Sequence, residues 1–182
     1  MTLTTLDPIT ALVVIDLQQG IVSRYPAADV LDRAGELAAA FRRHGLPVVL
    51  VTAAGGAPGR VQTPFSGGAP RADWADLVPE LDQQPSDLRI TKRTWGAFHN
   101  TDLDAQLRGL GVTQVVVVGI ATTAGVESTA RAAHEHGYHV TLAVDAMTDG
   151  NADAHDNSVL RIFPRLGETG TTAEVIALLD AR

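Results

Sequence analysis

The stretch that decides the fold is Gln114-Val-Val-Val-Val118 and its continuation Gly119-Ile-Ala-Thr-Thr-Ala-Gly-Val-Glu-Ser-Thr-Ala130. The apolar run of the first part is typical of a strand that is covered on both faces. The small residues that follow predict a strand-to-helix turn, and residues 125–136 predict a helix that ends before Gly137. Strand, turn and helix in this order make up one half of a βαβ unit.

The rest of the chain repeats this alternation. Apolar runs predict strands at 11–15, 47–51, 88–91 and 138–144, with a short strand near 166–169. Helical spacing predicts helices over 29–44, 102–108, 153–163 and 172–179, with Thr101 as a candidate cap for the second. Strands that alternate with helices predict an α/β fold with a mostly parallel sheet between two helical layers.

Composition narrows the class of protein. A chain of 182 residues with 45% hydrophobic and 19% charged residues predicts one folded domain over 1–182. The net charge of −7 and the lack of a basic cluster argue against a nucleic-acid partner. No apolar run reaches membrane-spanning length and no signal peptide is recognisable, so we expect a cytoplasmic protein without a membrane partner. The absence of cysteine excludes disulfides, thiolate zinc sites and cysteine nucleophiles.

Polar residues follow several predicted strands. In a parallel sheet the ligand site lies beyond the carboxyl ends of the strands, where Asp16, Lys92 and Asp145 are placed. Asp16 and Lys92 could pair across this crevice, although each alone also suits a turn former and a solvated lysine. The segment from Asp145 to Asp149 favours capping over catalysis. Glu127 and Arg131, four residues apart, favour a surface pair over a substrate role.

Two further features bear on ligand binding. The amides of the turn at 119–125 form a candidate anion or oxyanion site at a helix N-terminus. The irregular stretch 53–73, rich in Gly and Pro, is typical of a lid, a binding loop or an interface arm, with a floppy insertion as the alternative. Arg60, Arg71 and Arg93 are candidates for binding an acidic substrate, although the first two also suit solvated positions in this loop.

Taken together, these segments resemble the isochorismatase-like hydrolases, also called cysteine hydrolases. The matching blocks are Val13-Val-Ile-Asp16-Leu-Gln, Thr91-Lys92 with Trp95-Gly-Ala-Phe98, and Val115-Val-Val-Val-Gly-Ile-Ala-Thr122 with Val126-Glu-Ser-Thr-Ala130. The resemblance covers nearly the whole chain and implies a Rossmann-like three-layer α/β/α sandwich with a mostly parallel sheet of about six strands. It also implies a homodimer or homotetramer.

The resemblance implies which residues of this chain match the family's functional residues, and one position departs from the family's pattern. The Asp and Lys of the family's Asp–Lys–Cys triad match Asp16 and Lys92, but the nucleophile position holds Gly125. A non-proline cis peptide is implied between Ile120 and Ala121, with an oxyanion hole from the amides of Ala121 and Gly125. Glycine excludes thioester catalysis, and a substitute hydroxyl nucleophile from Thr122, Thr123 or Ser128 is disfavoured.

True isochorismatases resemble this chain in having glycine at that position, and they cleave a vinyl ether through acid catalysis. We therefore expect a hydrolase without a cysteine nucleophile, in which Asp16 is the general acid and base and Lys92 its partner, acting on a small-molecule substrate for which an acid is a candidate. Two departures count against isochorismate itself: the Arg-Thr-Trp run after Lys92 and the sequence from Ala121 to Ala124 differ from theirs. The alternative is a non-catalytic protein of the same fold that binds a small acid or a protein.

Four more residues are pocket candidates, namely Gln18, Trp95, Phe98 and Thr122, although core packing is an equal interpretation of the two aromatic residues. The stretch 52–56 has no histidine where related nicotinamidases bind a metal, and His134 and His136 point to different sides of a predicted helix. We therefore expect neither a metal nor a cofactor.

Overall fold

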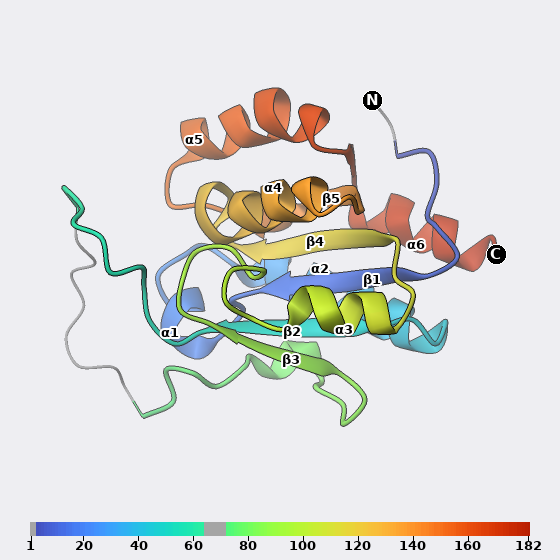
Figure 1. The fold of residues 1–182 in the computed structure, drawn as a ribbon, viewed down its shortest axis with the longest axis horizontal. Coiled ribbons are helices and arrows are strands. Elements are labelled where there is room, and N and C mark those ends of the chain that lie inside the picture. Colours follow the sequence, from blue (N-terminus) through green and yellow to red (C-terminus); the bar gives the residue numbers. More distant parts are fainter. Residues whose placement is uncertain (1–2, 64–71) are drawn as a thin grey trace.

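The computed structural model describes residues 3–63 and 72–182. Over these residues the core is a six-stranded, all-parallel sheet in the order β3-β2-β1-β4-β5-β6 (Figure 1). The strands are β1 (Thr10–Ile15), β2 (Val48–Ala53), β3 (Leu88–Lys92), β4 (Gln114–Ile120), β5 (His139–Thr148) and β6 (Glu168–Gly170). β1 and β4 are buried along their whole length, as their apolar runs predict.

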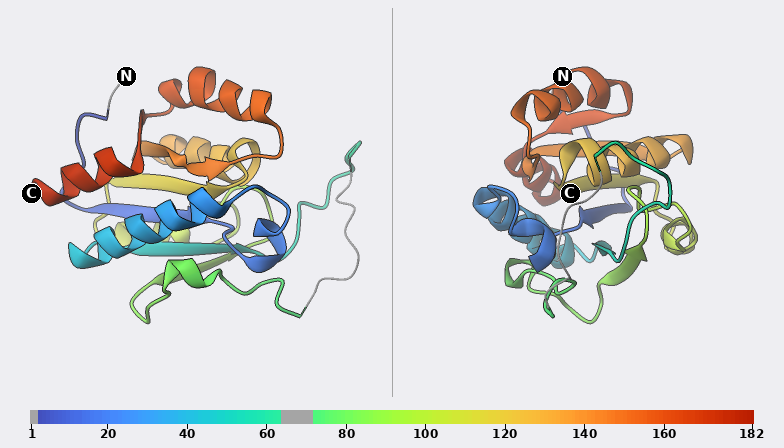
Figure 2. Two further views of the ribbon diagram at one scale, coloured as in Figure 1. Left: turned by 180° about the vertical axis from the view of Figure 1, so that it is seen from behind. Right: turned by 90° about the vertical axis from the view of Figure 1, so that its left-hand side faces the viewer.

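Helices cover both faces of the sheet. They are α1 (Gln19–Val22), α2 (Ala28–Arg43), α3 (Leu103–Gly109), α4 (Glu127–Glu135), α5 (Ala152–Asn157) and α6 (Thr172–Asp180). α2 and α6 lie on one face, and α3, α4 and α5 lie on the other (Figures 1 and 2). Side chains of β1 alternate between these layers, with Leu12 and Val14 in one apolar cluster and Val13 and Ile15 in the other. The predicted three-layer α/β/α sandwich is confirmed.

Two boundaries near the site differ from the prediction because tertiary contacts override the local pattern. β5 continues past Val144 to Thr148, with a shift in its register against β4, so Asp145 lies inside the strand and not at its end. α3 begins at Leu103, and Thr101 accepts a weak hydrogen bond from the Leu103 amide while it donates to the carbonyl of Ala97. Thr101 is therefore a turn residue before the helix as much as a cap.

Two predicted helices are interrupted by wider turns. A π-helical turn, Thr122–Val126, precedes α4, so the regular helix begins after position 125. The predicted helix over 153–163 is α5 followed by a π-helical turn at Ser158–Ile162 and a 3₁₀ turn at Phe163–Arg165. A single π-helical turn does not produce a distinct period of hydrophobic residues. The spacing of hydrophobic residues therefore predicts one continuous helix where the structure has an interrupted one.

The end of β1 lies unusually close to the end of β4. Gly119 has φ +117, and a Cβ there would lie 2.1 Å from the carbonyl oxygen of Ile15, so only glycine fits. This close approach brings Asp16 beside the turn that follows β4. In the described part of the chain, no helix has the length and apolar character needed to cross a membrane.

Candidate active site

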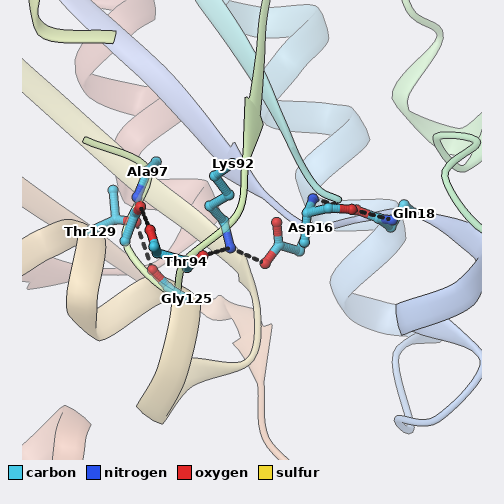
Figure 3. A network of polar contacts seen from close by, with 9 residues as sticks. Asp16, Gln18, Lys92, Thr94, Ala97, Gly125 and Thr129 are labelled. Carbon is cyan, nitrogen blue, oxygen red and sulfur yellow. Dashed lines mark hydrogen bonds and ion pairs between the residues drawn. The ribbon is translucent and has the colours of Figure 1, made fainter. Parts of the chain in front are cut away.

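An ion pair between Asp16 and Lys92 forms the centre of the site (Figure 3). The Lys92 ammonium donates to Oδ2 of Asp16 at 2.6 Å and to the carbonyl of Thr94 at 3.2 Å. Only 2% of the lysine side chain and 7% of the aspartate side chain is exposed. The two residues come from strands β3 and β1, which are separated by β2, so the predicted pairing across the carboxyl edge of the sheet is confirmed.

The backbone and surroundings of Asp16 fix its carboxyl group. Asp16 has φ +55, a left-handed conformation that Asp adopts more readily than most residues, as the chain turns from β1 into α1. Oδ1 is buried and makes no hydrogen bond within the described residues. Burial raises the pKa of Asp16 from its ordinary value of 3.8 to about 6, although the charge and hydrogen bond of Lys92 oppose this shift. Because Oδ2 accepts from the ammonium, a proton that binds this carboxyl belongs on Oδ1.

Gly125 lies against this pair. A Cβ at position 125 would lie 3.2 Å from Oδ2 of Asp16 and 2.7 Å from Cγ2 of Ile15. A side chain there would therefore point at the carboxylate, which is where a nucleophile could give up its proton, and glycine places no such group beside Asp16. The peptide between Ile120 and Ala121 is cis, as the resemblance implies.

The turn that carries Gly125 is held by hydrogen bonds from three directions. Thr129 donates to the carbonyl of Gly125 and accepts from the amide of Ala97, which ties the turn to the segment after Lys92 (Figure 3). The carboxylate of Asp149 accepts from the amide and hydroxyl of Thr123 at 2.9 and 2.7 Å. This carboxylate already neutralises part of the helix N-terminus that the sequence suggests as an anion site.

Thr122 is fully buried, and its hydroxyl lies 2.8 Å from Nδ1 of His155 in α5. It thus anchors the turn to α5, and its role as a pocket residue stays a prediction. Neither Asp149 nor His155 is identifiable as a site residue from the sequence, because the segment after β5 has no pattern that places it against the turn. The strand-end rule for parallel sheets would have found Asp149 if the extent of β5 had been known.

Gln18 is used by the protein itself. Its amide group accepts from the Ala53 amide at 2.7 Å and donates to the carbonyls of Ala53 and Trp74 at 3.2 and 3.1 Å. It therefore joins the end of β2 to the segment that returns to the sheet near Trp74. A pocket role for Gln18 has no support in these contacts.

The two aromatic candidates lie in different environments. Trp95 is 62% exposed, so it is not a core residue, and its pocket role stays a prediction. Phe98 is 8% exposed and stacks on His136 at a centroid distance of 5.1 Å, beside Tyr138 at 5.8 Å. Tyr138 precedes β5 and so lies at the amino ends of the strands, whereas Asp16 lies at their carboxyl ends. The contacts of Phe98 therefore support core packing.

The remaining charged candidates lie outside the centre. Arg60 and Arg93 are exposed, and Arg93 lies within 3.4 Å of the Ala54 carbonyl. Arg71 and part of the stretch 53–73 lie outside the described residues. Glu127 and Arg131 form the predicted pair, and Glu127 also accepts from Ser158. Over residues 3–63 and 72–182, no three His, Cys, Asp or Glu side chains are placed to hold a metal ion.

Asp145 performs the capping role predicted for its segment. Its Oδ1 accepts from the amide and hydroxyl of Thr172 at the start of α6, and Arg33 contacts its other oxygen at 3.4 Å. A hollow of about 490 Å³ between α2 and α6 is lined by these residues, away from Asp16 and Lys92. Chemistry and burial, more than the size of a hollow, therefore identify the site.

Comparison with known proteins identifies the family of the chain. The family model "Isochorismatase domain" matches residues 10–174. The chain belongs to the isochorismatase family. It is 44% identical over 174 residues to the uncharacterized isochorismatase family protein YwoC of Bacillus subtilis, with 92% of each chain covered. The solved structure of an isochorismatase family protein from Burkholderia thailandensis superposes with a TM-score of 0.91 at 43% identity, covering 97% of this chain and 98% of that one.

The family is hydrolytic and includes amidohydrolases. One such relative is the ureidoacrylate amidohydrolase RutB of Caulobacter vibrioides, 36% identical over 106 residues that cover 57% of this chain and 47% of that protein. The fold and the family expected from the sequence are thus confirmed. They identify the family and leave the activity of this chain to be argued from the residues at positions 16, 92 and 125.

Proposed function

We propose that this protein is a hydrolase that cleaves a small vinyl-ether acid of the isochorismate type, with Asp16 as general acid and base and Lys92 as its partner. The observation that carries the proposal is the Asp16 carboxyl group, which is buried, has one oxygen without a partner among the described residues and lies beside Gly125, which has no side chain to contact it. A pKa of about 6 for Asp16 lets this group hold a proton for a useful fraction of the time near neutral pH.

The reaction follows from these groups and conserves atoms and charge. Asp16 donates its Oδ1 proton to the terminal methylene carbon of the vinyl ether, whose double-bond electrons form the new C–H bond. The adjacent carbon becomes an oxocarbenium ion, stabilised by the ether oxygen. Water adds to that carbon and returns a proton to Asp16, and the resulting hemiketal releases pyruvate and the alcohol. No covalent enzyme intermediate is needed, so glycine at position 125 is compatible with turnover.

Lys92 has two functions in this proposal. Its ammonium holds Oδ2 of Asp16, which leaves Oδ1 as the acidic position, and its charge stabilises the carboxylate after proton transfer. An ammonium has three hydrogens, and two are used by Asp16 and Thr94 among the described residues. The third is available to the carboxylate of the substrate.

Pyruvate release from isochorismate tests the proposal, with the wild type compared with Asp16→Asn. General acid–base catalysis contributes roughly 10²- to 10⁴-fold, so we expect the substitution to lower the rate by at least about 100-fold. Asp180→Asn, at an exposed carboxylate paired with His44, is the matched control and should keep the wild-type rate. Equal rates in wild type and Asp16→Asn would refute the role of Asp16. Saturable binding of isochorismate without pyruvate release would favour the non-catalytic alternative.

A further inference from the structure

Tyr25 lies on the far side of the site from Lys92. It follows α1, in the connection to α2, and is half-buried against the apolar cluster beneath it. Its Cε1 atom is 3.7 Å from the position that a Cβ of Gly150 would take, so the ring packs on the segment directly after β5. Tyr25 therefore connects the segment that follows β1 with the segment that follows β5.

The order of the strands places Tyr25 relative to the ion pair. Lys92 approaches Asp16 from β3, on one side of β1, whereas Gly150 follows β5, on the other side. The turn with Gly125 follows β4, which lies between β1 and β5. A ligand above this turn would thus have Lys92 on one side and Tyr25 on the other.

The hydroxyl of Tyr25 makes no hydrogen bond to any residue that the structure describes. The chain's other tyrosine has a partner, since Tyr138 donates to Asp104 at 2.7 Å. Oδ1 of Asp16 is buried and also has no partner among the described residues. A donor and a buried oxygen that make no hydrogen bond to the described residues, both at the carboxyl ends of the strands, fit the contacts of a bound ligand.

Charge at this position favours one kind of ligand atom. Burial raises the pKa of Tyr25, the charges of Asp149 and Asp16 raise it further, and Arg24 lowers it. The phenol therefore stays protonated and can donate. Because two carboxyl groups lie within electrostatic reach of it, a neutral oxygen is a better acceptor there than a second carboxylate.

We propose that Tyr25 is a specificity-determining residue whose hydroxyl donates a hydrogen bond to a neutral oxygen of the substrate's alcohol portion, opposite the end held by Lys92. This inference rests on the proposed vinyl-ether hydrolysis for the identity of the substrate. The placement of Tyr25 itself rests on its contact with Gly150, the order of the strands and a hydroxyl that makes no hydrogen bond to the described residues.

Tyr25→Phe removes the hydroxyl and keeps the ring, and Tyr138→Phe is the matched control at the opposite edge of the sheet. With isochorismate as substrate, we expect Tyr25→Phe to raise KM about 3- to 10-fold with kcat changed less, as for the loss of one hydrogen bond to bound substrate. Tyr138→Phe should leave KM unchanged. An unchanged KM in Tyr25→Phe, with active wild type, would overturn the inference.

A second measurement does not depend on turnover. The chain has two tyrosines, so protein with ¹³C at the tyrosine Cζ gives two signals, which Tyr138→Phe assigns. We expect 2,3-dihydroxybenzoate, which carries neutral hydroxyls, to shift the Tyr25 signal and leave that of Tyr138, and pyruvate to shift neither. A shifted Tyr25 signal without pyruvate release from isochorismate would retain the inference and refute the proposed reaction. Pyruvate release without a shifted signal would refute the inference alone, and the absence of both would refute both.

Discussion

The pH dependence of folding stability offers a sharp test of the environment assigned to Asp16. Two effects compete there, because burial disfavours the charged carboxylate whereas Lys92 favours it. The folded-state pKa of about 6 lies above the ordinary value of 3.8, so burial is the larger effect. Between these values the folded protein binds more protons than the unfolded chain. The contribution of Asp16 to stability is therefore complete below pH 3.8 and is lost as the pH rises through 6.

The size of the effect follows from the same two values. At about 1.4 kcal/mol per pKa unit, a shift from 3.8 to about 6 changes the free energy of unfolding by about 2 kcal/mol between pH 4 and 7.5. Asp16→Asn cannot titrate, so the stability of this variant relative to wild type should rise by about that amount over this range. Urea unfolding at steps of half a pH unit measures the difference, and the other titrating groups cancel in the comparison.

Asp104→Asn is the matched control, with the opposite sign. Hydrogen bonds from Tyr138 and Arg108 outweigh burial and lower the pKa of Asp104, so the variant should lose stability relative to wild type as the pH rises through the acid range. If Asp16→Asn shows the same direction as Asp104→Asn, Lys92 outweighs burial and the reasoning about Asp16 is wrong.

Three further predictions follow from the ion pair and Gly125. Gly125→Ala should lower the free energy of unfolding by about 1–2 kcal/mol, because overpacking against Ile15 exceeds the gain in helix propensity. Gly109→Ala is the control, because a Cβ there would have no neighbour within 4 Å, and urea unfolding should show it to be neutral or stabilising. Lys92→Met should lower the free energy of unfolding by roughly 3–5 kcal/mol at pH 8, where Asp16 is left charged and unpaired. The loss should be smaller at pH 5, and urea unfolding at the two pH values measures the difference. The rate of pyruvate release at low substrate should fall about tenfold per pH unit above 6; a flat profile from pH 6 to 8 would contradict acid catalysis by Asp16.

The sequence predicts the sheet well and the turns poorly, for physical reasons. Runs such as 11–15 and 114–118 are apolar throughout because both of their faces are covered, and this is a strong local signal. α1 and the 3₁₀ turn Pro79–Leu81 are too short for a hydrophobic period, so no pattern in the sequence predicts them. The end of β5 is set by its pairing with β4, which no local pattern records.

The site shows the same division. Asp16 and Lys92 could be predicted because a polar residue directly after a buried strand must lie at the carboxyl edge of the sheet. The sequence leaves the contacts of Gln18 and Phe98 open, because whether a side chain contacts a ligand, the main chain or the core depends on the segments packed around it. Tyr25 carries no sequence signal at all, since its relation to Asp16 depends on the packing of its ring against Gly150.

In the proposed reaction Asp16 protonates a vinyl ether and water then attacks the pyruvate carbon. Incubation with isochorismate in ¹⁸O-labelled water tests this directly, with pyruvate measured over time and the alcohol product analysed by mass spectrometry. We expect pyruvate release by wild type, none above background by Asp16→Asn, and an alcohol that keeps its unlabelled oxygen. No release by the wild type, or an alcohol that carries ¹⁸O, would contradict it.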